Sequence, residues 1–111
     1  MANAWLFRGT HRVQGRKRII HEYNTALEYL RYGRIVLGQG GGKLDVESQD
    51  EELGFVCLAG QGTIEADGQT FRLGKYDALY VPRDSRCTVF STEAFDLAEM
   101  GSPASKKYPV Q

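Results

Sequence analysis

The stretch from Glu51 to Pro82 constrains the fold more than any other part of the sequence. An Asp-Gly pair, Asp67-Gly68, separates two short alternating runs, Thr63–Ala66 and Gln69–Leu73. Asp-Gly between such runs is typical of a β-hairpin, because a type I′ turn needs positive φ at both central residues. The centre of the chain is therefore predicted to consist of antiparallel strands.

Further short strand patterns recur on both sides of this hairpin, about ten residues apart. The additional predicted strands are Arg16–Tyr23, Arg34–Leu37, Lys43–Glu47, Leu53–Leu58, Ala78–Val81, Arg86–Phe90 and Ala94–Met100. A weak helical turn is predicted at Asn24–Leu30, which competes with a strand for the end of this segment. The glycine run at 38–42 is interpreted as a turn, because no phosphate-loop motif or helix pattern accompanies it. This pattern indicates an all-β sandwich or barrel.

The chain has 111 residues, which is the size of one domain. No apolar run approaches the roughly 18 residues of a membrane helix, and the N-terminus has no apolar stretch long enough for a secretory signal. We therefore expect a cytoplasmic protein with no membrane partner. Cys57 and Cys87 lie within apolar strand patterns and are expected to be buried free thiols.

The formal net charge is zero, so composition gives no reason to expect nucleic-acid binding. The charges are unevenly spread, however. Basic residues crowd the first twenty positions, at Arg8, Arg12, Arg16, Lys17 and Arg18, and acidic residues crowd the middle, at Asp45, Glu47, Asp50, Glu51 and Glu52. Either these are two solvated surface patches, or the basic arm packs on an acidic patch of the same or a neighbouring subunit.

The central motifs resemble those of the cupins, which are double-stranded jelly-roll barrels. Within that group the sequence is similar to the family of 5-keto-4-deoxyuronate isomerase and 5-deoxyglucuronate isomerase, and it matches their N-terminal half. The carrying segments are ELG-x-V-x-x-x-G-x-GTI at 52–64, DG-x-x-x-x-LG-x-x-DALYV at 67–81 and SPA-x-x-x-YP at 102–109. The resemblance implies a single cupin barrel at residues 24–111, preceded by an N-terminal arm or edge strand at residues 1–23.

A metal-binding cupin takes its ligands from G-x₅-H-x-H-x₃₋₄-E-x₆-G and P-x-G-x₂-H. Aligned on Gly60 and Pro82, the glutamate position is Leu53 and the last histidine position is Cys87. The paired histidine positions fall either on Glu47 and Gln49 or on Val46 and Ser48. The sequence has two histidines, His11 and His21, and both lie in the arm. A catalytic metal needs about three converging ligands, so we expect no metal and no other cofactor.

The resemblance leaves three functions open. The first is a degenerate, metal-free cupin of the sugar-acid isomerase family that serves as a small-molecule binding or assembly module. The second is an aldose–ketose isomerase of deoxyuronate-type sugars, acting alone or with a separate metal-bearing chain. The third is a sensor or carrier that binds a ligand without chemistry. If the chain is an enzyme, the candidate catalytic residues are Glu47, Cys87 and Tyr80.

A ligand inside the barrel is expected to contact side chains on the inward strand faces. These are predicted to be Phe55, Cys57, Tyr80, Cys87 and Glu99. The expected ligand is a small sugar acid. We also expect a homodimer or a higher oligomer, because Trp5, Leu6 and Phe7 give the arm an apolar segment to bury on a partner.

Overall fold

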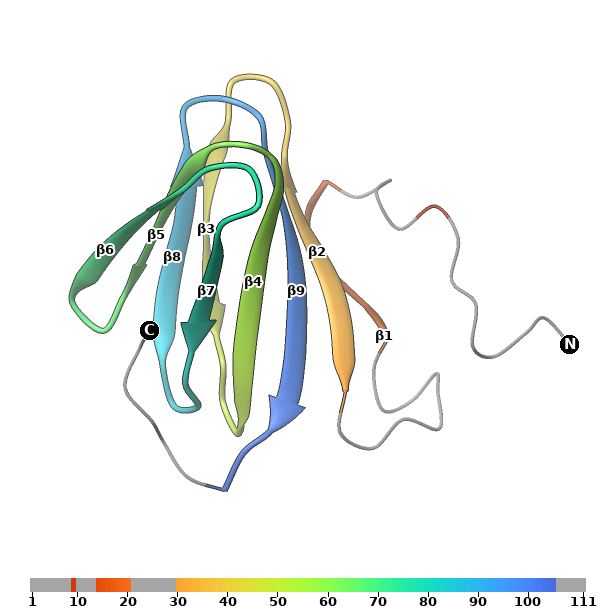
Figure 1. The fold of residues 1–111 in the computed structure, drawn as a ribbon, viewed down its shortest axis with the longest axis vertical. Helices are drawn as coiled ribbons and strands as arrows, with labels where there is room; N and C mark the ends of the chain where they lie inside the picture. Colours follow the sequence, from red (N-terminus) through yellow and green to blue (C-terminus); the bar gives the residue numbers. More distant parts are fainter. Residues whose placement is uncertain (1–8, 10–13, 21–29, 106–111) are drawn as a thin grey trace, which may run out of the picture.

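The computed structural model describes residues 9, 14–20 and 30–105 of the chain. The described part consists of strands joined by turns, with no helix (Figure 1). The strands are β1 (Gly15–Ile20), β2 (Arg31–Leu37), β3 (Gly42–Glu47), β4 (Glu51–Gly60), β5 (Gly62–Ala66), β6 (Gln69–Leu73), β7 (Ala78–Val81), β8 (Arg86–Ser91) and β9 (Phe95–Pro103).

The strands form two antiparallel sheets that face each other. One sheet has five strands in the order β1-β2-β9-β4-β7, and the other has four in the order β3-β8-β5-β6. Strands that are distant in sequence become neighbours, as where β9 lies between β2 and β4. This arrangement confirms the predicted all-β jelly roll. It also makes β1 and β3 edge strands of different sheets, which is important for the site described below.

The predicted hairpin at the centre of the chain is confirmed. Ala66 pairs with Gln69, so Asp67 and Gly68 form a two-residue loop between β5 and β6. Both loop residues have positive φ, 49° for Asp67 and 75° for Gly68. These are the left-handed conformations that a type I′ turn requires.

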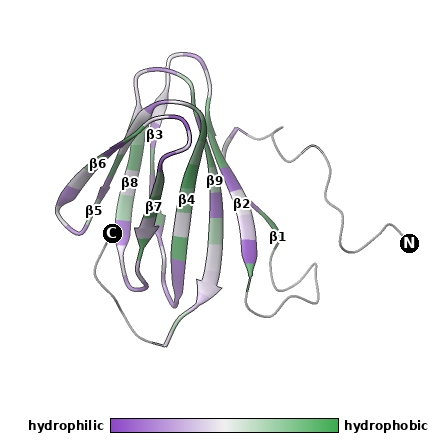
Figure 2. Ribbon diagram, in the orientation of Figure 1, coloured by the Kyte–Doolittle hydropathy of each residue, from purple (hydrophilic) through white to green (hydrophobic). Residues whose placement is uncertain are grey.

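The core lies between the two sheets and follows the alternation of each strand. On β4 the residues Leu53, Phe55 and Cys57 are buried, while those between them are partly exposed. Figure 2 shows that β4 is largely hydrophobic above its hydrophilic lower end. Cys87 and Val89 on β8 are buried opposite them, as predicted. Both cysteines are free. The complete cluster is Ile35, Leu37, Val46, Leu53, Phe55, Cys57, Ile64, Ala66, Leu73, Leu79, Val81, Cys87, Val89, Phe95 and Leu97.

The end of β9 differs from the predicted boundary. β9 continues through Pro103 rather than ending at Met100, because Glu51 and Glu52 extend β4 alongside it. The glycine-rich segment after Leu37 is a turn between β2 and β3, as predicted. The predicted helical turn at 24–30 lies outside the described residues, except for Leu30.

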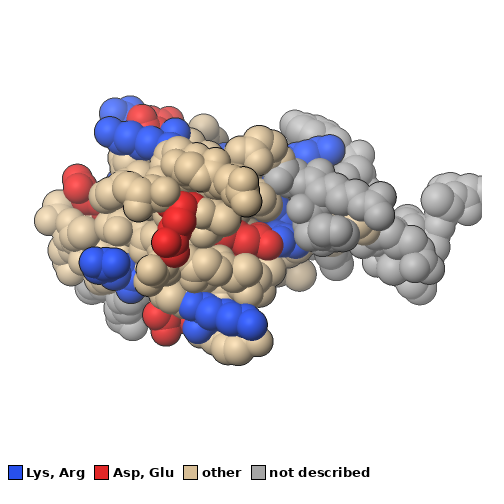
Figure 3. Space-filling view, turned by 90° about the horizontal axis from the view of Figure 1, so that it is seen from above, with Lys and Arg blue, Asp and Glu red and all other residues tan. Residues whose placement is uncertain are grey.

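Charged residues of both signs are interspersed over the end of the molecule seen in Figure 3. In the part of the chain that the structure describes, no helix is long and apolar enough to cross a membrane. The division into residues 1–23 and 24–111 stays a prediction. Within the first of these segments, the described strand β1 pairs with β2 as an edge of the five-stranded sheet.

Candidate functional site

A buried ion-pair cluster joins β1 to the interior of the barrel. Glu99 on β9 has no exposed surface, and it receives hydrogen bonds from Arg16 Nε and Nη2, both at 2.7 Å. Arg18 Nε donates a third bond to Glu99, at 3.1 Å. A buried carboxylate is costly unless it is paired and hydrogen-bonded. The two arginines meet that requirement for Glu99.

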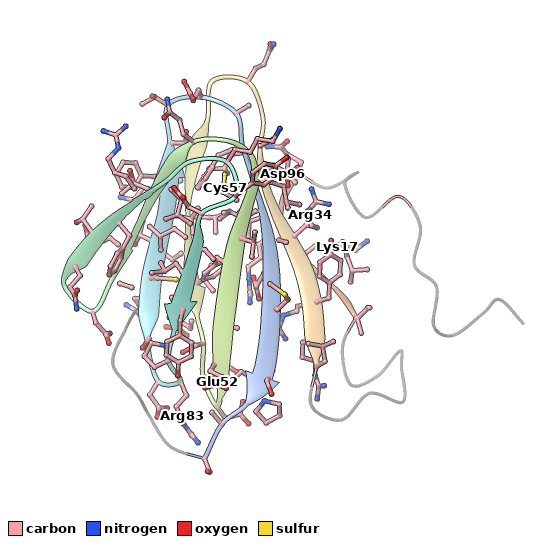
Figure 4. All side chains as sticks on the ribbon, in the orientation of Figure 1. Lys17, Arg34, Glu52, Cys57, Arg83 and Asp96 are labelled. Atoms are coloured by element: carbon pink, nitrogen blue, oxygen red, sulfur yellow. The ribbon has the colours of Figure 1, made fainter. Side chains whose placement is uncertain are left out.

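Strand alternation explains how arginines reach the interior from an edge strand. Arg16 and Arg18 lie opposite Ile35 and Gly33 of β2, so they share the inward face of the sheet. Gly33 also lies opposite Glu99, and it has no side chain to block the arginines. In contrast, the intervening residue Lys17 lies opposite Arg34, which pairs with Asp96 outside the barrel (Figure 4).

A second acidic residue, Glu51 on β4, extends this cluster. Arg18 Nη2 lies 2.6 Å from Glu51 Oε1. The pair passes over Gly101, where an added Cβ would lie 2.3 Å from that oxygen. Burial disfavours the charged form of Arg18, but the hydrogen bond to Glu51 and the charge of Glu99 outweigh it, so the pKa of Arg18 is raised. This contact is of the kind expected if the basic arm packs on the acidic patch of its own subunit.

Beside the cluster, the surface is hollowed where the edge strands β1 and β3 approach each other. We call this concavity the seam hollow. Its volume is about 460 Å³, and it is lined by Arg16, Asp45, Glu47, Gln49 and Arg86. A smaller hollow of about 290 Å³ adjoins it and shares Glu47, Gln49 and Arg86. The seam hollow thus combines cationic, anionic and amide side chains from both sheets.

The positions that hold a metal in metal-binding cupins are filled by core residues. Val46 and Ser48 are buried, whereas Glu47 and Gln49 are exposed, so Val46 and Ser48 are the inward pair. Ser48 Oγ donates to the Pro82 carbonyl at 2.7 Å and accepts from the Ser85 N–H at 2.9 Å.

The other two positions, Leu53 and Cys87, are also buried, with 1% and 2% of their surface exposed. Within the described ranges, no group of three or more His, Cys, Asp or Glu residues is placed to hold a metal. Leu53 and Val46 offer no donor atom, and the Ser48 hydroxyl is already hydrogen-bonded. The Cys87 thiol that remains does not make up the donor set of a catalytic metal.

The predicted lumen residues divide into an interior set and one residue outside. Phe55, Cys57, Cys87 and Glu99 face the interior, as predicted. The placement of Tyr80 there was wrong. Tyr80 lies opposite Gly54 on the outer face of the sheet, and its hydroxyl donates to Glu52 Oε2 at 2.9 Å. Its neighbours in β7 occupy the inward positions.

The two thiols have the environment of core residues rather than nucleophiles. Burial, with a smaller contribution from the charge of Glu99, raises the pKa of Cys87 to about 11. Burial also raises the pKa of Cys57, whose Sγ lies 3.5 Å from the carbonyl oxygens of Ala59 and Gly60. Both side chains are therefore neutral thiols at ordinary pH. The third catalytic candidate, Glu47, is exposed at the seam hollow and pairs with Arg86.

Sequence reasoning did not connect Arg16 and Arg18 with Glu99. The sequence nevertheless indicates that Glu99 needs a cationic partner. It shares a strand face with Phe95 and Leu97, and a carboxylate on an apolar face is costly unless it is paired. The alternating Arg16 and Arg18 are suitable partners. Asp45 was noted only as part of the acidic patch, since its place at the seam depends on how the two sheets meet.

Comparison with proteins of known structure identifies the fold. An IolB-like protein from Salmonella typhimurium superposes with a TM-score of 0.77 and 22% identity, covering 89% of this chain and 41% of that one. KdgF from Halomonas sp. superposes with a TM-score of 0.64 and 18% identity, covering 80% of this chain and 79% of that one. A cupin protein from Bacteroides fragilis matches with a TM-score of 0.66, 18% identity and coverage of 86% and 82%. These likenesses establish the cupin fold.

Sequence comparison identifies the family. The 4-deoxy-L-threo-5-hexosulose-uronate ketol-isomerase of Shigella boydii is 34% identical over 76 residues, which are 67% of this chain and 28% of that protein. The enzyme of the same name from Enterobacter sp. is 38% identical over 80 residues, 67% of this chain and 29% of that protein. The match thus takes in less than a third of each curated relative. The sequence model of the KduI/IolB family matches residues 5–111, and the chain therefore belongs to that family.

Proposed function

We propose that this chain is a metal-free cupin that serves as a binding module for a sugar acid or as an assembly module. Its family and fold make it a cupin similar to the sugar-acid isomerases. The curated relatives are named as ketol-isomerases of a hexosulose-uronate, which supports a sugar acid as the ligand. That this chain works without a metal is a proposal beyond its family and fold, because fold alone does not determine activity.

The observation that carries the proposal is the filling of the cupin ligand positions by Val46, Ser48, Leu53 and Cys87. All four side chains are buried. Val46 pairs directly with Cys87, so two of these positions pack against each other across β3 and β8. Restoring a ligand set here would require replacing residues that now stabilise the barrel. These positions are thus part of the packed interior of the barrel.

Two measurements test this function. Elemental analysis of the purified protein is expected to find no stoichiometric transition metal, and a stoichiometric metal that resists dialysis would overturn the metal-free proposal. Calorimetric titration with D-galacturonate, a stable hexuronate, is expected to show saturable binding by the unmodified chain. Failure to bind any hexuronate would overturn the binding role and leave assembly.

A specific pair of residues favours isomerase activity as a second candidate function. At the seam hollow, the Glu47 carboxylate lies 2.6 Å from the Arg86 guanidinium. Ketol isomerisation needs a base that moves a proton between adjacent carbons and a cation that stabilises the enediolate. Isomerisation of a deoxyuronate by this chain alone, abolished by Glu47→Gln, would establish this function. Absence of turnover would exclude the chain as a self-sufficient isomerase.

Self-association is a separate proposal. Its basis is the apolar segment Trp5, Leu6 and Phe7, which lies outside the described residues. Burial of aromatic residues gives much of the free energy of association at protein interfaces. Sedimentation at micromolar concentration is expected to show a dimer, and replacement of Trp5 and Phe7 by serine is expected to produce a monomer. A monomeric unmodified chain would overturn the proposal.

A further inference from the structure

The interior of the barrel is filled by side chains, whereas the seam hollow is open to a ligand. The inward side chains Phe55, Cys57, Leu97 and Phe95 have 0% or 1% of their surface exposed, so they fill the space between the sheets. A polar ligand would have to displace them. The seam hollow is already open, and its volume of about 460 Å³ falls within the roughly 300–1,000 Å³ of small-molecule sites.

Arg16 provides a fixed donor at this hollow. Glu99 accepts from its Nε and Nη2, so these bonds hold one edge of the guanidinium inside the barrel. A guanidinium has five N–H groups in a rigid fork. Arg16 Nη1 makes no hydrogen bond to a residue in the described part of the chain. The side chain is 30% exposed and lines the hollow, so a ligand there can accept from it. Because Glu99 already orders Arg16, a ligand would lose little side-chain entropy by binding it.

Arg86 provides an exchangeable donor at the same place. Its Nε and Nη2 both donate to one oxygen of Glu47, at 3.2 and 2.6 Å. The two side chains are 74% and 53% exposed. Exposed pairs of this kind contribute little to stability, so exchanging Glu47 for another carboxylate costs little. A ligand carboxylate that offers both oxygens would gain the bidentate geometry that this pair lacks.

Asp45 and Gln49 also line the hollow, and their side chains can form hydrogen bonds with hydroxyl groups of a ligand. Thr88 donates to Asp45 Oδ1 at 2.8 Å, whereas Asp45 Oδ2 accepts no hydrogen bond from a residue that the structure describes. The exposed Gln49 amide adds a donor and an acceptor. The two acids that line the hollow and Glu99 behind Arg16 leave no surplus of positive charge there. A doubly charged phosphate is therefore disfavoured relative to a ligand with one carboxylate and several hydroxyls.

We propose that the seam hollow binds a small polyhydroxy monocarboxylate, with its carboxylate on Arg86 and its hydroxyls on Arg16 and Asp45. The inference rests on the proposed binding function and names the site and the class of ligand. It places recognition outside the interior, where metal-binding cupins hold their metal. It also gives the edge strand β1 a role in binding, because Arg16 belongs to that strand.

Calorimetric titration of the full chain with D-galacturonate tests the inference. The unmodified protein is expected to bind this acid at least about tenfold more tightly than D-galactose, which lacks the carboxylate. Arg86→Gln is expected to weaken galacturonate binding about tenfold or more, and Asp45→Asn several-fold. Arg72→Gln, an exposed arginine on β6, is the matched control and is expected to leave affinity unchanged.

Three other results of these titrations would contradict the site, the binding function or the ligand class separately. Binding of galacturonate that is unaffected by Arg86→Gln would overturn the site while leaving the binding function intact. No binding by the unmodified chain would overturn the binding function itself. Tighter binding of inorganic phosphate would overturn the ligand class. As a measurement without mutation, amide chemical shifts at 16, 45–49 and 86–88 are expected to move on titration; shifts confined to other residues would overturn the site.

Discussion

Glu99 on β9 holds Arg16 on β1 through two hydrogen bonds of 2.7 Å, although the two residues are 83 positions apart. The carboxylate is fully buried, whereas the arginine is 30% exposed. The pair thus joins the first described strand to the last. Its contribution to the free energy of unfolding differs from that of a surface pair, because removing one partner leaves the other poorly compensated.

We therefore expect Glu99→Gln to lower the free energy of unfolding by about 3 kcal/mol. The amide has nearly the shape of the carboxylate but leaves Arg16 and Arg18 without their shared anion. Glu47→Gln makes the same chemical change in the pair with Arg86 and is expected to lower the free energy of unfolding much less, because this pair is exposed to solvent. Urea unfolding measures both, and equal losses would contradict the importance of burial.

Gly33→Ala is expected to detach β1 from the sheet. The added Cβ would lie 2.5 Å from the Lys17 carbonyl oxygen, so the backbones would have to separate, at a cost of about 1–3 kcal/mol. Amide hydrogen exchange should show faster exchange across Gly15–Ile20. Gly54→Ala is the control, since its Cβ would approach only Met100 Cε, at 4.0 Å. Unchanged protection of β1 in Gly33→Ala would refute the expectation.

Ser48→Ala is expected to destabilise the barrel by about 1–3 kcal/mol. Without the hydroxyl, the buried Ser85 N–H loses its acceptor at 2.9 Å. Ser91→Ala serves as the comparison, because Ser91 makes similar bonds, to Gln61 and Glu93, in solvent. Thermal unfolding of the two variants should differ. Comparable midpoints would show that the Ser48 bonds are replaced on mutation.

Alkaline pH is expected to destabilise the protein partly through Cys87. Its pKa is about 11 in the folded state against 9.0 for the free group. Above pH 9 the unfolded chain loses this proton while the folded chain keeps it, so stability falls as pH rises from 9 to 11. The total is roughly 2–3 kcal/mol. Lysines and tyrosines also titrate in this pH range, so the measurement compares how steeply the free energy of unfolding falls with pH in the unmodified chain and in Cys87→Ala. Parallel curves would contradict a contribution from Cys87.

Strand positions were predictable where polar and apolar residues alternate clearly. Cys87 and Val89 alternate with polar neighbours, so their inward direction followed from period 2 alone. At Leu79, Tyr80 and Val81 every residue is apolar, and the pattern contained no contrast. Tyr80 was therefore placed on the wrong face. Its direction is set by pairing with β4, which a single strand does not encode.

The candidate site was less predictable because it depends on contacts between sheets. The ligand pattern left two histidine pairs open, and burial of Val46 and Ser48 was needed to choose between them. Arg16 and Asp45 line the same hollow because β1 and β3 are edge strands of different sheets. Sequence spacing indicates which side chains share a strand face. It does not indicate which sheet edges adjoin.

The position of β9 between β2 and β4 has a consequence for synthesis of the chain. β1 and β2 can pair early, since they are close in sequence, and their arginines are made long before Glu99. Until Phe95–Pro103 leaves the ribosome, the facing edges of β2 and β4 have no partner strand. Unpaired edges attract other strands. Completion of the barrel thus waits for its last described strand, and premature termination would leave nascent chains open to aggregation.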